Sequence, residues 1–590
     1  MLTPRIQRRT QNPAVLAALS ASGVADFESN ILSGRISVAE KALELFAPKL
    51  KHLDNPFLMA DMQKAVERLA KAIKLKQVIG IETDHDCDGQ TSHAVIHETL
   101  IKVFGHPKSK IRSYIGHRMK EGYGLSGSLA KRILNDEPKA DLIITADNGS
   151  TDEARIAQLK YQDIDTIVTD HHAIPKEGIP RSAFAVLNPT REDCQYPDSA
   201  IAGCMVAWLF MAATRGFMIQ QGLLSKEVMN LSTMLDFVAV GTVADCVSMA
   251  NSVNNRAVTI YGMKRISAQS RSCWRAFKQS FQKEIGSEFI GFTIGPMLNS
   301  DGRLSDAFSS VNFLLSESSQ ESNHWVNELT KQNEQRKLIQ KNITDQAMRE
   351  AVKLVEAGQS SIAVYLQSGH AGVHGISASR IKDAFGRPTI IFSPKEGEPD
   401  VMTGSARSVD GIHLKHILDK INEMDEAIFI KYGGHSGAAG MTIVKGKFES
   451  FCNLFESQII ARVEDEGEEK VILGPVIYTD GELHPDDINL ATVKKIKSLE
   501  PFGRGFEYPV YNANATIVAK RMVGKEMQHA QLQLNFSGKI VKAIWFNAIA
   551  HKVAHDIGIE DEVCVIFKLT EEYFNRQHKL SAMIEYIEKI

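Results

Sequence analysis

Hydrophobic residues between positions 57 and 76 recur at steps of three and four, which predicts an amphipathic helix. Short apolar runs then alternate with helical patterns along the chain. Strands are expected at 78–82, 111–115, 141–146 and 164–169, and helices near 91–104, 126–135 and 152–160. This alternation predicts a mostly parallel sheet with helices on both faces. Ligands of such sheets bind at the carboxyl ends of the strands.

The pattern changes after residue 316. Residues 317–357 are polar and almost free of Gly and Pro, which predicts one long helix that ends at Gly358. A helix of roughly 40 residues is about 60 Å long, enough to act as a strut between domains. Residues 361–450 begin a second α/β unit that is rich in Gly and Ser. Beyond the acidic stretch VEDEGEEK, short alternating runs such as QLQLNF predict a small β-barrel or β-sandwich over 470–590.

Acidic and histidine residues follow three of the predicted strands, and a fourth motif adds a carboxylate after another apolar segment. These residues are Asp84, Asp86, Asp88, Asp147, Asp170, His171, His172 and Asp245. A single Asp in such a place is more often a turn residue or a helix N-cap. Four such motifs in order favour a shared metal site, because cations would offset the repulsion between crowded carboxylates. Oxygen ligands with one or two imidazoles suit Mn²⁺ or Mg²⁺, and the histidine favours Mn²⁺.

Composition narrows the class of protein. A chain of 590 residues is expected to form several domains. Seven scattered cysteines without a CxxC pair argue against a disulfide scaffold or a zinc ribbon and predict a cytoplasmic protein. No apolar run has the length of a transmembrane helix, so no membrane association is expected. The formal net charge of −3 is weak evidence against nucleic-acid binding, since basic patches can coexist with an acidic site.

The chain resembles the DHH phosphoesterase superfamily and, within it, the RecJ-type single-strand-specific exonucleases. The resemblance rests on motifs that occur in the family's order: DHDCDG, RMKEGYGLS, ADNGS, TDHH, GTVADCVSM, GPMLNSDGRL, GISASR, GSARS, GGHSGAAG and LEPFG. It implies an α/β DHH domain built on a parallel sheet with an N-terminal helical extension, a long connecting helix, a second α/β DHH-associated domain and a C-terminal OB-like β domain. The expected bounds of these four parts are 1–316, 317–358, 359–461 and 470–590.

The resemblance also implies a site for two Mn²⁺ or Mg²⁺ ions that hydrolyses phosphodiester bonds. The family's metal ligands correspond to Asp86, Asp88, Asp147, His171 and Asp245, and Asp84 and His172 are expected to support them in catalysis. Substrate-binding groups are expected at Arg118, Arg303, Arg380, Ser405, Arg407, Gly434 and His435. Without the family match, each such Arg is more often a surface charge and each Gly cluster a turn.

The implied activity is 5′→3′ digestion of single-stranded DNA in repair and recombination, with a single-strand-binding protein or a helicase as a partner. Candidates for strand contact in the last domain are Lys520, Arg521, Lys525, Tyr573 and Phe574, for which a core or solvent-facing role is about as plausible. Two alternatives are a phosphodiesterase for short oligonucleotides or cyclic dinucleotides and an inactive repair or replication scaffold. The long helix and the β domain argue against the first, and the retained carboxylates argue against the second.

Several family motifs are altered in this chain. Where the family usually has Arg-Leu-Asn-Ala-Ala-Gly-Arg, this chain has Met297 in the first position and Asp301 in the fifth. Where the family usually has PFGxGNP, this chain has PFGRGFEYP over 501–509. His85 replaces the usual aromatic residue, and Ser436-Gly437 replaces the commoner Ala-Met. The expected metal ligands are all present, so these changes bear on substrate length, end preference and partner contacts.

Overall fold

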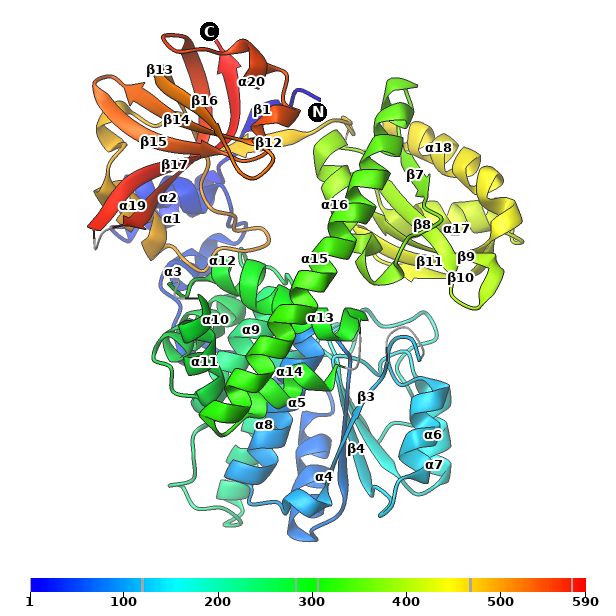
Figure 1. Ribbon diagram of the computed structural model, residues 1–590. Coiled ribbons are helices and arrows are strands. Elements are labelled where there is room, and N and C mark those ends of the chain that lie inside the picture. Colours follow the sequence, from blue (N-terminus) through cyan, green and yellow to red (C-terminus); the bar gives the residue numbers. More distant parts are fainter. Residues whose placement is uncertain (1, 118–120, 282–283, 305–306, 466–469, 575–576) are drawn as a thin grey trace. The chain divides into compact units, whose positions relative to one another are not determined.

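The computed structural model describes residues 2–117, 121–281, 284–304, 307–465, 470–574 and 577–590 (Figure 1). The chain forms two compact units. The sheet unit consists of Gln11–Asn333 and Ile496–Tyr508, and the barrel unit consists of Met1–Thr10, Glu334–Lys495 and Pro509–Ile590.

A five-stranded sheet organises the sheet unit. Its strands lie in the order β3-β2-β4-β5-β6, and all neighbours are parallel, as predicted. Their bounds are β2 Ile79–Thr83, β3 Ile111–Ile115, β4 Leu142–Ala146, β5 Asp165–Thr169 and β6 Ala185–Leu187. The direction of the crossovers reverses between β2 and β4, and ligands of open α/β sheets bind outside the carboxyl ends of strands at such a point. The strand β6 was not predicted, because a run of three apolar residues gives no periodic signal.

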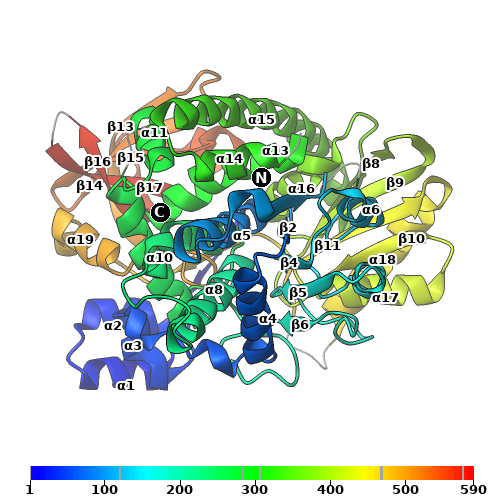
Figure 2. The same ribbon diagram turned by 90° about the horizontal axis from the view of Figure 1, so that it is seen from below.

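Helices cover both faces of this sheet. α6 and α7 pack on one face through buried residues that include Leu129, Ile133, Ile156 and Leu159, and α5 and α8 pack on the other (Figure 1 and Figure 2). The sheet unit contains the helices α1 Pro13–Ala21, α2 Asp26–Ser33, α3 Ala42–Phe46, α4 Met62–Lys74, α5 Cys87–Glu98, α6 Gly127–Asn135, α7 Glu153–Tyr161, α8 Gly203–Gln220, α9 Leu235–Ala244, α10 Val253–Ser267, α11 Ser272–Phe281, α12 Ser287–Phe289, α13 Gly295–Leu304 and α14 Phe308–Leu315.

The segment Ile496–Tyr508 belongs to the sheet unit although the residues on either side of it belong to the barrel unit. Arg256, which is 1% exposed, donates hydrogen bonds to the carbonyl oxygens of Leu499 (2.8 Å) and Pro501 (3.2 Å). Its guanidinium also lies 4.2 Å from the ring centroid of Phe506. A buried arginine is costly unless its donors are satisfied, so these carbonyls fix the segment in place.

The long helix α15 Ser319–Glu356 has 38 residues, and Gly358 ends it in the left-handed region with φ +85°. A positive φ is accessible to glycine without steric cost, which makes it a common residue after a helix. The boundary between the two units falls within this helix, after Asn333. The predicted long helix is therefore confirmed.

The barrel unit contains a second, mixed sheet. Its strand order is β10-β11-β9-β8-β7, in which β7 and β8 are parallel and the other neighbours antiparallel. The C-terminal part of α15 and α16 pack on one face, and α17 and α18 pack on the other. The bounds are β7 Ile362–Tyr365, β8 Thr389–Lys395, β9 Glu398–Arg407, β10 Phe429–Gly434, β11 Ala438–Val444, α16 Ala371–Phe385, α17 Leu414–Met424 and α18 Phe448–Glu464.

The last part of the chain forms a closed barrel with the strand order β13-β14-β15-β17-β16. Only β15 and β17 are parallel neighbours, and a five-stranded barrel of this kind is the OB architecture that the resemblance implies. Every second residue of QLQLNF is buried, which confirms the strand inferred from its alternation. The bounds are β1 Arg5–Arg8, β12 Val476–Thr479, α19 Leu490–Ser498, β13 Tyr511–Val523, β14 His529–Phe536, β15 Lys539–Trp545, α20 Val553–Asp556, β16 Glu562–Phe574 and β17 Gln577–Lys589.

In the described part of the chain, none of the helices combines the length and the apolar character needed to cross a membrane.

Candidate metal centre

The residues after β2 lead directly into a helix. Asp86 is the N-cap of α5, and its carboxylate accepts hydrogen bonds from the N–H groups of Asp88 (3.0 Å) and Gly89 (3.2 Å). This cap starts the helix at Cys87, earlier than the apolar pattern near residue 91 indicates. Asp88 consequently lies in the first turn of α5. Asp84 follows β2 and lies 2.9 Å from Nδ1 of His85.

Asp88 is 1% exposed and also contacts the start of α8. Its carboxylate oxygens accept hydrogen bonds from the N–H groups of Gly203 (2.6 Å) and Cys204 (2.9 Å). A carboxylate at a helix N-terminus satisfies backbone donors and interacts favourably with the helix dipole. Asp88 therefore stabilises the fold as well as offering an oxygen to a cation.

Asp147 follows β4 with φ +63°, and its side chain is 3% exposed. A Cβ atom on Gly203 would lie 2.8 Å from the Cβ of Asp147, so the start of α8 can approach this residue only as glycine. α8 thus packs against both Asp88 and Asp147.

His171, which follows β5, faces three carboxylates. Its Nε2 atom lies 3.1 Å from Asp147, 3.7 Å from Asp245 and 3.9 Å from Asp88. Asp245 comes from a different kind of element, because it caps the C-terminus of α9 rather than following a strand. The switch point of the sheet and the ends of two helices therefore bring these residues together.

His172 is held by Asp170, which is 1% exposed. The carboxylate of Asp170 lies 2.8 Å from Nδ1 of His172 and accepts hydrogen bonds from the N–H groups of Ser150, His171 and His172. Burial alone would raise the pKa of Asp170, but His172 and these donors hold that pKa well below its usual range. Burial alone would lower the pKa of His172, but its contact with Asp170 raises that pKa to about 9.

The pKa values of three other aspartates shift upward, in contrast to that of Asp170. Burial first, and neighbouring carboxylates second, raise the pKa values of Asp86, Asp147 and Asp245, while burial lowers the pKa of His171. A divalent cation would relieve this repulsion, and a neutral imidazole is the form that binds a metal. In the part of the chain that the structure describes, three groups place ligand atoms within 4.8 Å of one another: Asp84–Asp86–Asp147, Asp88–His171–Asp245 and Asp147–His171–His172. All seven residues expected to act in catalysis occur in these groups, so the donor set fits Mn²⁺ or Mg²⁺.

The expected phosphate-binding residues of the barrel unit gather at one end of its mixed sheet. Ser405 and Arg407 lie on β9 opposite Gly440 and Ala438 of β11, and Gly434 lies opposite Ala439 at the end of β10. The N–H of His435 donates to the carbonyl oxygen of Ala438 (2.8 Å), which closes the same turn.

Arg407 also lies close to α16. A Cβ atom on Gly375 would lie 2.7 Å from Nη2 of Arg407, so the guanidinium packs against that helix. Arg380 is exposed on the same helix. Arg118 and the side chain of Arg303 lie outside the described residues.

The candidates on the barrel differ in their surroundings. Lys520 donates hydrogen bonds to the carbonyl oxygens of Ala554 (2.7 Å) and Ile557 (2.8 Å), which gives it a structural role. Arg521 donates to Gln531, Lys525 is exposed, and Tyr573 is 67% exposed. The side chain of Phe574 lies outside the described residues.

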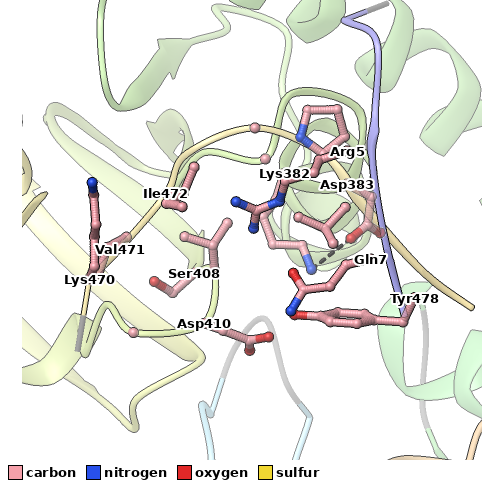
Figure 3. A pocket seen from close by; sticks show the side chains of 16 residues that line it. Arg5, Gln7, Lys382, Asp383, Ser408, Asp410, Lys470, Val471, Ile472 and Tyr478 are labelled. Carbon is pink, nitrogen blue, oxygen red and sulfur yellow. Dashed lines mark ion pairs between the residues drawn. The ribbon is translucent and has the colours of Figure 1, made fainter. Parts of the chain in front are cut away.

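A separate hollow of about 720 Å³ lies in the barrel unit, between the end of α16 and the β1–β12 ribbon (Figure 3). Its lining mixes charges: Lys382 pairs with Asp383 at 2.6 Å, and Arg5, Lys470 and Asp410 also contribute. Of the expected site residues that the structure describes, none lines this hollow.

Three family models match the chain: the DHH family N-terminal domain over residues 77–242, the DHHA1 domain over 358–461 and the RecJ OB domain over 479–586. A single-stranded-DNA-specific exonuclease RecJ from Haemophilus influenzae is 32% identical over 553 residues, which cover 92% of this chain and 93% of that protein. The chain belongs to the RecJ family. RecJ from Thermus thermophilus, solved in complex with Mn²⁺, has a TM-score of 0.78 at 23% identity over 99% of this chain and 80% of that chain, which shows the shared fold. A crystal structure of exonuclease RecJ bound to manganese is 27% identical, with a TM-score of 0.56 over 68% of this chain and 95% of that chain.

Two contributors to the metal centre of this RecJ chain were not predicted to act in catalysis or as metal ligands. Asp170 was noted only as an acidic residue after the apolar strand in TDHH, and that position is the signal that marks it. Gly203 could not, because it lies 115 residues from Asp88 and no local pattern connects the two.

Proposed function

We propose that this protein is a metal-dependent exonuclease that hydrolyses single-stranded DNA from its 5′ end, in DNA repair and recombination. The observation that carries the proposal is the convergence of Asp86, Asp88, Asp147, His171 and Asp245 in a chain of the RecJ family. The H. influenzae relative is a single-stranded-DNA-specific exonuclease, which supports the same substrate here.

The proposed metal ligands are these five residues, with Asp84 and His172 beside them. Bound divalent cations would activate water and offset the negative charge that develops on the phosphate. The manganese-bound RecJ structure supports Mn²⁺, and the carboxylate-rich donor set also suits Mg²⁺.

The remaining groups orient this site. Asp170 fixes the backbone at His171 and the ring of His172, and a hydrogen bond of this kind sets the tautomer and direction of an imidazole. Nδ1 of His172 faces Asp170, which leaves Nε2 to bind a phosphate oxygen of the substrate. His172 is also half-exposed, with a side-chain exposure of 46%, so a substrate can reach it.

Recognition of the 5′ end is assigned to Ser405, Arg407 and His435. Arg407 offers a planar donor that can bind a phosphate in a bidentate manner, and the backbone at Gly434 leaves room for a close approach. The barrel is assigned to binding the part of a long DNA strand that lies far from the cleaved end. A short oligonucleotide or a cyclic dinucleotide would not need such a domain. Location in the cytoplasm and contact with a single-strand-binding protein or a helicase stay predictions.

The test is digestion of a single-stranded 30-mer with Mn²⁺, labelled at the 5′ or the 3′ end, with a duplex control. Early release of mononucleotides from the 5′ label, with the duplex intact, is the expected result. Preferential release from the 3′ label would contradict the assigned polarity, and the absence of cleavage by a folded, metal-loaded protein would contradict the proposed activity.

A further inference from the structure

A tight turn presents one arginine beside the metal centre. Gly503 and Phe506 exchange both backbone hydrogen bonds (3.0 Å each), which leaves Arg504 and Gly505 at the corner. Gly505 has φ +75°, as the third residue of a type II turn requires. The side chain of Arg504 is exposed at this corner, and among the described residues it has no hydrogen-bond or ion-pair partner.

This turn lies across the segment that follows Asp245. The N–H of Met249 donates to the carbonyl oxygen of Arg504 (2.9 Å), and a Cβ atom on Gly505 would lie 3.2 Å from the Cβ of Ala250. Asp245 caps the C-terminus of α9, and Met249 lies on the segment that leaves this helix. The backbone contact between Met249 and Arg504 therefore places the turn beside the rim of the metal centre.

The backbone that carries Arg504 is rigidly held within the sheet unit. Arg256 lies under Phe506, and Arg35 donates to the carbonyl oxygen of Glu507 (3.0 Å). On the other side of the turn, the N–H of Phe502 donates to the hydroxyl of Ser287 (2.8 Å). A donor on a fixed backbone loses little entropy on binding, which suits it for positioning a ligand.

We propose that Arg504 positions the DNA strand by contacting the backbone phosphate next to the scissile one. The proposal rests on the proposed exonuclease function. Asp245, which precedes the segment that the turn contacts, is 23% exposed, so the site is open on this side. Cations at the centre would already offset the charge of the scissile phosphate. The guanidinium at the rim is therefore expected to contact the next phosphate along the strand.

The sequence places this arginine at the x position of the PFGxGNP motif, inside the altered stretch PFGRGFEYP. Since this position is not fixed in the motif, Arg504 is a candidate for a substrate contact particular to this chain. The altered residues Phe506 and Glu507 belong to the anchor of the turn.

The test compares Arg504→Gln and Arg504→Lys with Lys226→Gln as a matched control. Lys226 is exposed and follows the far end of α8, an 18-residue helix that starts at the metal centre and is about 27 Å long. Arg504→Gln should lower kcat/KM on a single strand roughly tenfold, the effect of losing one hydrogen bond to a charged group. Arg504→Lys should recover most of this loss, and Lys226→Gln should match the wild type.

A strand with a neutral methylphosphonate at the second linkage from the attacked end identifies the phosphate. On this strand the wild type should fall to the level of Arg504→Gln, so that the difference between them vanishes. A difference of the same size on both strands, or no effect of Arg504→Gln on the normal strand, would overturn the proposal. The proposal would also be overturned if Arg504→Gln changed only the dependence of cleavage on Mn²⁺ concentration. That result would show that Arg504 merely offsets the charge of Asp245.

Binding without Mn²⁺ separates this proposal from the exonuclease function. In fluorescence anisotropy, Arg504→Gln should weaken binding of the normal strand and reduce the slope of log affinity against log salt by about 0.7. If the wild type binds but does not cleave, this loss would support the Arg504 contact although the proposed function has failed. Equal affinities of the wild type and Arg504→Gln at every salt concentration would overturn the contact.

Discussion

The carboxylate of Asp88 accepts a 2.6 Å hydrogen bond from the N–H of Gly203, so a candidate metal ligand also caps the helix that packs behind the metal centre. Its second oxygen accepts from Cys204. Loss of this side chain therefore removes more than a charge from a crowded site. Relief of repulsion would stabilise the fold, whereas the two uncapped N–H groups would destabilise it.

We expect Asp88→Ala to abolish cleavage and also to lower the free energy of unfolding. Each buried N–H left without a partner costs about 1–3 kcal/mol, which outweighs the relief of repulsion in a buried cap. Asp245→Asn is the matched comparison, because none of the described residues donates a hydrogen bond to the Asp245 carboxylate. Asp245→Asn should abolish cleavage without lowering the free energy of unfolding, because it relieves repulsion and leaves no backbone donor unpaired. Urea unfolding of both variants without metal would decide the point, and equal stabilities would contradict the capping role.

Asp170→Asn should weaken Mn²⁺ binding by roughly 10- to 100-fold, the usual effect of losing a group that orients a metal ligand. The amide can no longer accept from all the donors around Asp170, so His171 and His172 lose their fixed directions. Electron paramagnetic resonance of free Mn²⁺ in a titration measures this directly. Unchanged Mn²⁺ affinity in a folded variant would mean that Asp170 has a purely structural role.

Gly375→Ala should reduce the preference for a 5′-phosphate without destabilising the protein. The added methyl group would meet Nη2 of Arg407 at 2.7 Å, and a flexible guanidinium can move away. Alanine also favours the helical backbone of α16 by up to about 1 kcal/mol over glycine. Competition between 5′-phosphorylated and 5′-hydroxyl strands, together with thermal unfolding, tests both parts. Arg407→Ala is the reference, and it should weaken binding of the phosphorylated end more than the hydroxyl end.

Truncation should have opposite outcomes on the two sides of Ile496–Tyr508. A chain that ends at Lys470 lacks two carbonyl partners of Arg256, Leu499 and Pro501, and should lose the fold of the sheet unit. A chain that ends at Tyr508 keeps them and should still hydrolyse a 5-mer, while digestion of a 40-mer should suffer from loss of the barrel. Circular dichroism and both substrates distinguish the cases. A well-folded shorter chain would show that Arg256 tolerates the loss.

The sequence reveals those parts of the site that local patterns encode. The apolar runs before Asp84, Asp147 and Asp170 indicate strands, and in a parallel sheet the ends of strands meet at one edge. The apolar segment before Asp245 indicates a further carboxylate, but the pattern does not reveal that this residue caps a helix instead of following a strand. The contact between Asp88 and Gly203 and the position of Arg504 depend on tertiary packing between distant segments. No periodicity along the chain reports such contacts.

The return of Ile496–Tyr508 to the sheet unit also sets an order of events during protein synthesis. Translation supplies the chain from its N-terminus, and domains generally fold as they emerge. The carbonyl partners of Arg256 at Leu499 and Pro501 leave the ribosome after the entire second sheet has been made. A chain made only as far as the second sheet therefore contains all five proposed metal ligands. It still lacks Ile496–Tyr508, the segment that contacts the residues after Asp245. We therefore expect the sheet unit to reach its final stability late in translation, since its first and last segments are made far apart in time.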